Sequence, residues 1–198
     1  MKLIGKNSLS QYISYLLFIL FILFACQCIY ALIGFSVSYY NLKTGNHIFS
    51  DFFIIGTDVG WSKNKWTLPM NDLLKFKFYV PFTKQNLITG IFNAGSVMNN
   101  ILRELFIMLF LYSSYQIFKG ISNENVFNVK VVLWLRRFGW LNVIFTVIMI
   151  IINFFNAKDL YAFAYSGIPF LFFGGLILFV VEFFKKGLEL QNQADLTI

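Results

Sequence analysis

Arg103 and Glu104 are the residues of this sequence whose types come closest to a chemical site: a basic and an acidic residue side by side, followed by an uncharged stretch over 105–118. Ionisable side chains at membrane depth are costly and are often functional. Neighbours on a helix diverge by about 100°, so these two do not face each other as a pair. Arg103 instead shares a helical face with mostly polar residues, which predicts a stripe turned toward other helices. The members of this face are Ser96, Asn100, Arg103, Ile107 and Ser114. The alternative is that Arg103 extends to the outer headgroups while Glu104 finds a loop or headgroup partner.

Other chemical signatures are missing from the sequence. It has no H-E-x-x-H, G-x-S-x-G, P-loop or G-x-G-x-x-G motif. Cys26 and Cys28 point to different sides of a helix, and they are expected to be apolar thiols rather than a disulfide. His47 is the single histidine and has no cysteine or clustered carboxylates around it in sequence. We therefore expect no enzyme, no metal site and no cofactor.

Four long uncharged stretches determine the class of protein, over 7–42, 105–118, 138–157 and 160–181. A bilayer core about 30 Å thick needs roughly 20 apolar residues of helix to cross it. The sequence is 58% hydrophobic and 13% charged, whereas soluble domains average about 25% charged residues. These features predict an all-α membrane protein with four transmembrane helices in a single membrane domain. The expected spans are about 12–38, 97–118, 138–157 and 160–182.

Lysine and arginine positions predict the orientation, because short cytoplasmic loops keep the positive charges. Lys2 and Lys6 precede the first span, and the segment 119–137 holds four basic residues against one acidic residue. Both termini, this loop and the tail over 183–198 are therefore expected in the cytoplasm of a bacterium, with the chain in its inner membrane. The segment 43–94 then lies outside. It carries six lysines against three aspartates, but long loops follow the charge rule weakly.

The outer segment has the pattern of a small sheet. Residues 74–83 alternate between apolar and polar types, which predicts a half-buried strand. Two aromatic residues flank a polar turn over 61–66, which is compatible with a hairpin, and 48–55 is a candidate for another strand. So small a sheet is not stable alone, so we expect it to rest on the outer ends of the first two helices.

The cytoplasmic loop 119–137 predicts an amphipathic helix over 126–137. Its apolar stripe consists of Phe127, Val131, Leu135 and Phe138. This helix would lie on the inner membrane face, where Arg136 and Arg137 either anchor the third span at headgroups or present a surface to a partner.

Polar and small residues in the last two spans predict helix contacts. Asn142 and Asn153 are expected to hydrogen-bond across helices, and Gly167, Gly174 and Gly175 to allow close helix approach.

Two short motifs resemble a known family. Phe127 is followed by Leu-Arg-Arg-Phe-Gly over 135–139, and the chain ends in FKKGLELQNQADLTI over 184–198. Both are similar to the domain of unknown function 2975 family, small bacterial membrane proteins with four helices. One departure is that Val129 and Lys130 stand where the family has an acidic residue.

This resemblance implies a role rather than an activity: a membrane component that modulates a small helix-turn-helix regulator. Direct nucleic-acid binding is not expected, because the net charge of +7 is divided between the two sides of a bilayer. Two alternatives are an immunity or stress protein that binds a peptide or lipid at its outer loop, and a structural subunit of a membrane complex. The candidate functional residues are Arg103, Glu104, Phe127, Arg136, Arg137, Asp195, Leu196 and Thr197.

Overall fold

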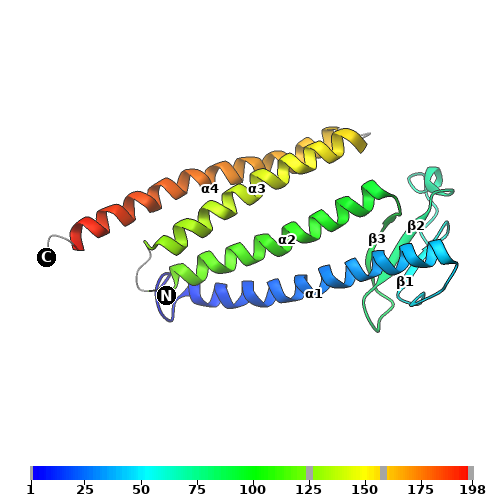
Figure 1. Ribbon diagram of the computed structural model, residues 1–198, viewed down its shortest axis with the longest axis horizontal. Coiled ribbons are helices and arrows are strands. Elements are labelled where there is room, and N and C mark those ends of the chain that lie inside the picture. The colour runs from blue at the N-terminus through cyan, green and yellow to red at the C-terminus, as the bar shows by residue number, and fades with distance from the viewer. Residues whose placement is uncertain (1, 124–126, 157–159, 196–198) are drawn as a thin grey trace. The chain divides into compact units, whose positions relative to one another are not determined.

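The computed structural model is mostly helical (Figure 1). It describes the backbone of residues 2–123, 127–156 and 160–195, and the side chains of these residues apart from 153–156, 160–166 and 194–195. The elements are α1 (Leu9–Thr44), β1 (Phe53–Gly56), a short 3-10 helix (Leu68–Met70), β2 (Lys75–Tyr79), β3 (Asn86–Ile91), α2 (Ala94–Ile121), α3 (Val129–Asn156) and α4 (Leu160–Asp195). Within the described residues, four helices are long and apolar enough to cross a membrane. The predicted four helices and small sheet are thus confirmed.

The chain divides into two compact units. The helical unit comprises Met1–Ala25 and Leu105–Ile198, and the sheet unit comprises Cys26–Glu104. The helices α1 and α2 each contribute one part to each unit. The sheet unit therefore has helical segments of its own on which the strands can pack.

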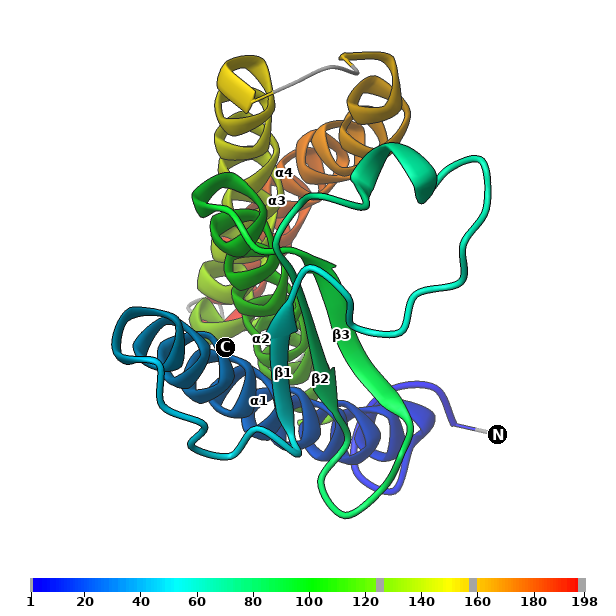
Figure 2. The same cartoon turned by 90° about the vertical axis from the view of Figure 1, so that its right-hand side faces the viewer.

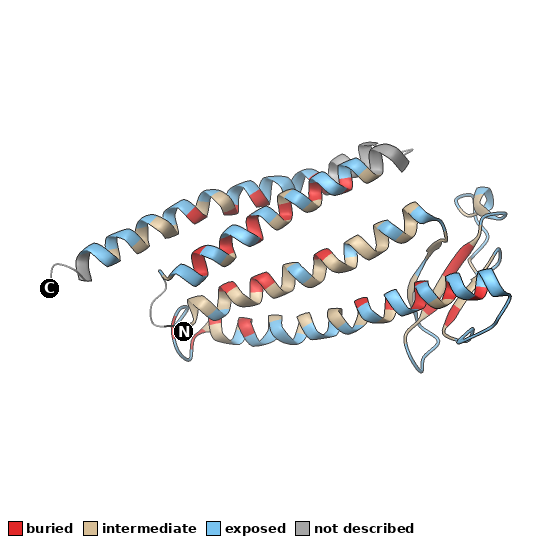
Figure 3. Ribbon diagram, in the orientation of Figure 1, coloured by how far each residue is buried: buried red, intermediate tan, exposed pale blue. Residues whose placement is uncertain are grey.

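The sheet is antiparallel, with β2 between β1 and β3 (Figure 2). Phe53 pairs with Phe78, and Phe78 in turn pairs with Ile88. Because successive strand residues point to opposite faces, Phe76 and Phe78 share one face, and both are fully buried (Figure 3). They pack with Ala31 and Phe35 of α1 in the core of this unit.

The strands differ in extent from the prediction. The expected strand over 74–83 is only Lys75–Tyr79, because Pro81 lacks a donor N–H and Phe82 has a left-handed φ of 62°. The candidate strand over 48–55 is Phe53–Gly56. No strand forms over 61–66, so the hairpin expected there is wrong.

In the helical unit, apolar and aromatic side chains make the core. The first part of α1 meets α2 through Phe18 with Tyr115 and Phe21 with Tyr112, whose ring centroids lie 5.0 and 5.1 Å apart. A second cluster joins α2, α3 and α4, consisting of Ile117, Val131, Val132, Leu135, Phe138, Ile177 and Val181.

Glycine brings α3 and α4 together at one point. A Cβ atom added to Gly174 would lie 2.9 Å from the carbonyl oxygen of Gly139. The predicted close approach is confirmed for Gly174, whereas the neighbouring Gly175 has no atom of another element within contact range.

Three helix ends differ from the predicted spans. The amphipathic helix expected over 126–137 is not separate, since α3 runs without interruption from Val129 to Asn156. Three residues of its apolar stripe, Val131, Leu135 and Phe138, are buried among α2 and α4 instead, whereas Phe127 is exposed. The same spacing suits a helix interface as well as a membrane surface. The helix α1 extends to Thr44 and α4 to Asp195, since no proline or glycine stops either helix at the predicted position.

Candidate functional site

A buried lysine lies at the centre of the site that the sheet unit offers. Lys75 and Lys77 lie on the face of β2 opposite Phe76 and Phe78. If nothing covered this face, both lysines would be exposed to solvent. The segment 57–74 folds over this face near Lys75, whose exposed fraction is only 4%. Lysine is almost never so buried unless it is paired, and its partners therefore define the site.

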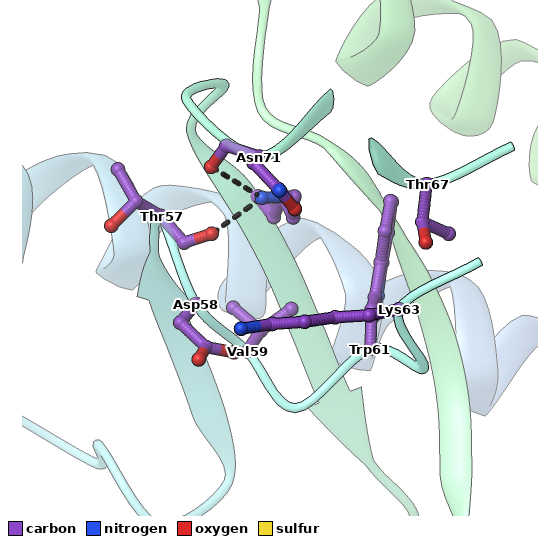
Figure 4. A pocket seen from close by; sticks show the side chains of 8 residues that line it. Thr57, Asp58, Val59, Trp61, Lys63, Thr67 and Asn71 are labelled. Atoms are coloured by element: carbon purple, nitrogen blue, oxygen red, sulfur yellow. Dashed lines mark hydrogen bonds between the residues drawn. The ribbon is translucent and has the colours of Figure 1, made fainter. Parts of the chain in front are cut away.

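The ammonium group of Lys75 is bound by backbone oxygens. Its Nζ donates to the carbonyl oxygen of Asn71 at 3.0 Å and to that of Thr57 (Figure 4). It also lies 5.8 Å from the ring centroid of Trp61. Among the described residues Lys75 forms no ion pair with a carboxylate. Since an ammonium has three donors and these carbonyls use two, both a donor and the charge remain for a ligand.

A pocket of about 230 Å³ opens beside this group (Figure 4). Its lining residues are Thr57, Asp58, Val59, Trp61, Lys63, Thr67, Asn71 and Lys75. Two cationic side chains therefore face one carboxylate, which leaves a net positive site. Pockets for drug-sized ligands are about 300–1,000 Å³. The volume therefore suits a smaller molecule or the end of a longer one.

Hydrogen bonds hold the walls of the pocket in place. The indole N–H of Trp61 donates to Thr89 Oγ1 at 2.8 Å, and this hydroxyl donates to the carbonyl oxygen of Phe76, also at 2.8 Å. Thr67 Oγ1 donates to the carbonyl oxygen of Ser62 at 2.7 Å, and Asn64 Oδ1 accepts from the backbone of the same turn. The ring is therefore fixed to β3 before any ligand arrives, so little ordering is needed on binding.

Glu104 has a partner that its sequence neighbours did not indicate. Gln27 Nε2 of α1 donates to Glu104 Oε1 of α2 at 2.9 Å, while Glu104 Oε2 is buried without a hydrogen-bond partner. The partner is thus a helix residue and not the expected loop or headgroup. Arg103 is exposed, so the two charged neighbours diverge as predicted.

Substituting Glu104 tests whether its charge or its shape matters. Glu104→Gln keeps an oxygen that accepts from Gln27, so we expect the free energy of unfolding to stay within about 1 kcal/mol of the wild type. Glu104→Ala leaves the half-buried amide of Gln27 unpaired and should cost about 1–3 kcal/mol. Unfolding in mixed detergent micelles measures both. Equal losses in the two variants would show that the negative charge is required.

The remaining candidate residues belong to the helical unit. The Phe127 ring is 5.4 Å from that of Phe184 and lies against Gly187, where a Cβ atom would be 2.6 Å away. The guanidinium of Arg137 lies 4.7 Å from the ring centroid of Trp134, and Arg136 is exposed. These candidate residues lie on α3 and on the segment just before it.

The other predicted residues lie near the end of the chain and within α3. Asp195 ends α4, and Leu196 and Thr197 lie outside the described residues. Asn142 Nδ2 donates at 2.7 Å to the carbonyl oxygen of Phe138 in its own helix, so the expected bond across helices is wrong for this side chain. Asn153 lies outside the described side chains.

The residues that sequence analysis missed as site members are Lys75, Trp61 and Gln27. Lys75 was assigned to a strand, and no local pattern marks it as buried. One available signal was the density of turn-forming residues over 57–74, which is typical of a loop that can cover a sheet face.

These features define a mostly helical chain with four helices suited to membrane spans and a small sheet unit that carries a pocket. No protein-family model, curated protein or solved structure matches the chain.

Proposed function

We propose that this chain is a multi-pass protein of the bacterial cytoplasmic membrane that senses a small anionic ligand at Lys75 and acts through a soluble helix-turn-helix regulator, without catalysing a reaction itself. The observation that carries the proposal is the ammonium of Lys75, which is 4% exposed, borders a pocket and has no carboxylate partner among the described residues. Burying an uncompensated charge is costly. A ligand that supplies the counter-charge would offset this cost.

The proposed orientation places the sheet unit outside the cell and both termini inside. Its support is the distribution of lysine and arginine in the short loops, with Lys2 and Lys6 on one flank and the 119–137 segment on the same side. The resemblance to the domain of unknown function 2975 family supports the regulator as partner. The surfaces such a partner would reach include the exposed Arg136 and the end of α4.

Benzoate is a suitable probe of the pocket, because it combines a carboxylate for Lys75 with a planar ring for Trp61. We expect benzoate to raise the unfolding temperature of the full-length protein in lipid nanodiscs, and benzamide, its neutral counterpart, not to do so. Lys75→Met should weaken benzoate binding at least about tenfold, because hydrogen bonds to charged groups contribute about 1.5–3 kcal/mol. Isothermal titration measures the affinity.

Lys77→Met is the matched control for this substitution. Lys77 lies on the same strand and the same face, but it is only half-buried, lies over the ring of Tyr79 and does not line the pocket. Benzoate affinity should therefore stay unchanged in this variant. Two results would contradict the proposal: benzamide binding as tightly as benzoate, or unchanged benzoate affinity in Lys75→Met. Lys75 would then only stabilise the fold of the 57–74 segment through its hydrogen bonds.

A second candidate function, binding of a peptide, is favoured by one observation. A groove of about 260 Å³ runs beside Ile54 and Ile55 of β1, one of the two edge strands of the sheet, and is also lined by Asn41 and His47. Extended peptides add to such edges through backbone hydrogen bonds. This mode would suit an immunity protein. It does not use Lys75, so the Lys75→Met variant also separates the two candidates.

A further inference from the structure

Two cationic side chains of the helical unit lie over aromatic rings. The Nζ atom of Lys119, near the end of α2, lies 5.3 Å from the ring centroid of Tyr115. The guanidinium of Arg137 on α3 lies 4.7 Å from the ring centroid of Trp134. Both cations are exposed, and neither forms an ion pair within the part of the chain that the structure describes. The described side chains therefore leave this positive charge uncompensated.

A third ring connects the two cations. The ring centroid of Tyr112 lies 5.3 Å from that of Trp134 and 6.3 Å from that of Tyr115. Side chains on a helix lean toward its N-terminus, and each cation accordingly lies over a ring that precedes it in its own helix. Since α2 and α3 run in opposite directions, this lean brings both charges toward Tyr112. We call the five side chains Tyr112, Tyr115, Lys119, Trp134 and Arg137 the α2–α3 cationic patch.

The α2–α3 cationic patch offers many hydrogen-bond donors and few acceptors. The hydroxyl of Tyr115 accepts from Lys119 Nζ at 3.0 Å. The hydroxyl of Tyr112 accepts from Gln116 Nε2 at 2.8 Å. Neither hydroxyl donates to another described residue, so both O–H groups remain available beside the N–H groups of the guanidinium. The stretches 105–123 and 127–156 contain no aspartate or glutamate. Such a surface fits an anionic group that only accepts hydrogen bonds, as a phosphate diester does.

The surroundings of the patch favour one source of the phosphate. Leu109, Leu133 and Trp140 of the same two helices are 43%, 42% and 51% exposed. Both helices are long and apolar enough to cross a membrane. A free phosphate ion would leave the apolar side chains in water, whereas a phospholipid brings acyl chains together with its phosphate. Tryptophan and tyrosine are enriched where membrane-spanning helices meet headgroups, so the rings of the patch agree with a lipid.

We propose that the α2–α3 cationic patch binds the headgroup phosphate of an anionic phospholipid. Arg137 binds the phosphate through parallel N–H···O bonds, and the ring of Trp134 already holds its guanidinium in place. Lys119 and the two tyrosine hydroxyls supply further donors. Phosphatidylglycerol suits the patch better than phosphatidylcholine, because the choline ammonium would lie beside two cations. The proposal rests on membrane insertion of the helices and is independent of the ligand at Lys75.

Arg136 supplies the matched control. It is also an exposed arginine of α3, but within the described residues it contacts no ring and forms no ion pair. Arg137→Gln and Arg136→Gln remove the same charge from adjacent exposed positions. Neither substitution should prevent folding, and any effect of the net charge is equal in the two variants.

Native mass spectrometry of the full chain in detergent micelles measures the affinity of each variant for added lipid. We expect the wild type to bind phosphatidylglycerol several-fold more tightly than phosphatidylcholine. Arg137→Gln should weaken phosphatidylglycerol binding about tenfold, because a charge-assisted pair is lost, whereas Arg136→Gln should keep the wild-type affinity. Tyr115→Phe retains the ring that packs on Phe18 but removes one O–H donor, so it should weaken binding by a smaller factor.

Three results would overturn the proposal. Equal losses in Arg137→Gln and Arg136→Gln would show that any positive charge near this end of α3 is sufficient. Equal affinity for the two lipids would show that the patch does not recognise headgroup charge. If inorganic phosphate alone raised the unfolding temperature of the micelle-bound chain as much as phosphatidylglycerol did, the ligand would be a soluble anion and not a lipid.

Discussion

Phe76→Ala should lower the free energy of unfolding of the sheet unit by about 3–5 kcal/mol, the usual cost of removing a buried phenylalanine ring. Phe76 is 0% exposed. Its ring centroid lies 5.0 Å from those of Phe35 and Phe78 and 6.2 Å from that of Phe92, so the cavity would open between the sheet and the helices that support it. Hydrogen exchange of the β2 and β3 amides in the micelle-bound protein measures the loss as faster exchange.

Phe49→Ala is the control, because it removes an equal ring from an exposed position of the same unit. Surface substitutions usually change stability by no more than about 0.5 kcal/mol. Exchange in β2 and β3 should then stay close to that of the wild type. If Phe76→Ala had as small an effect as Phe49→Ala, the strands would be held mainly by their backbone ladder and not by the aromatic core.

The aromatic core of the sheet could be predicted from the sequence, but the pocket on the opposite face could not. Alternation along β2 places Phe76 and Phe78 together whatever the rest of the chain does. The burial of Lys75 instead depends on where the 57–74 segment folds. That position is set by contacts distant in sequence, such as the Trp61–Thr89 hydrogen bond, which joins residues 28 positions apart. Local pattern carries no information about such a contact.

The same distinction applies to the helices. Charge-free stretches predicted four helices because membrane insertion constrains composition over about 20 residues at a time. The helices are longer than the predicted membrane spans, since α1 continues to Thr44 where strands pack on it. The divergence of Arg103 and Glu104 follows from helix geometry alone. The partner Gln27, at 77 positions from Glu104, requires the packing of α1 on α2.

Adjacent glycines of α4 allow a paired test of the packing between α3 and α4. A Cβ atom on Gly174 would lie 2.9 Å from the carbonyl oxygen of Gly139 and 3.1 Å from Cβ of Asn142. Backbone atoms of α3 cannot give way unless the whole helix moves. We therefore expect Gly174→Ala to cost about 1–3 kcal/mol, as overpacking of a well-packed interface usually does. Unfolding of the full chain in mixed detergent micelles gives the free energy.

Gly175→Ala separates this steric effect from a change in helix propensity. The position has nothing within contact range outside its own helix, and alanine in a helix is more favourable than glycine by about 0.5–1 kcal/mol. The two variants have the same composition and differ by one position, so propensity and insertion cost are matched. Opposite signs would show that the helices meet at Gly174, because only contact with α3 distinguishes the two sites. If both variants were equally stable, α3 and α4 would be free to separate at this point, and the close approach of Gly139 and Gly174 would not contribute to stability.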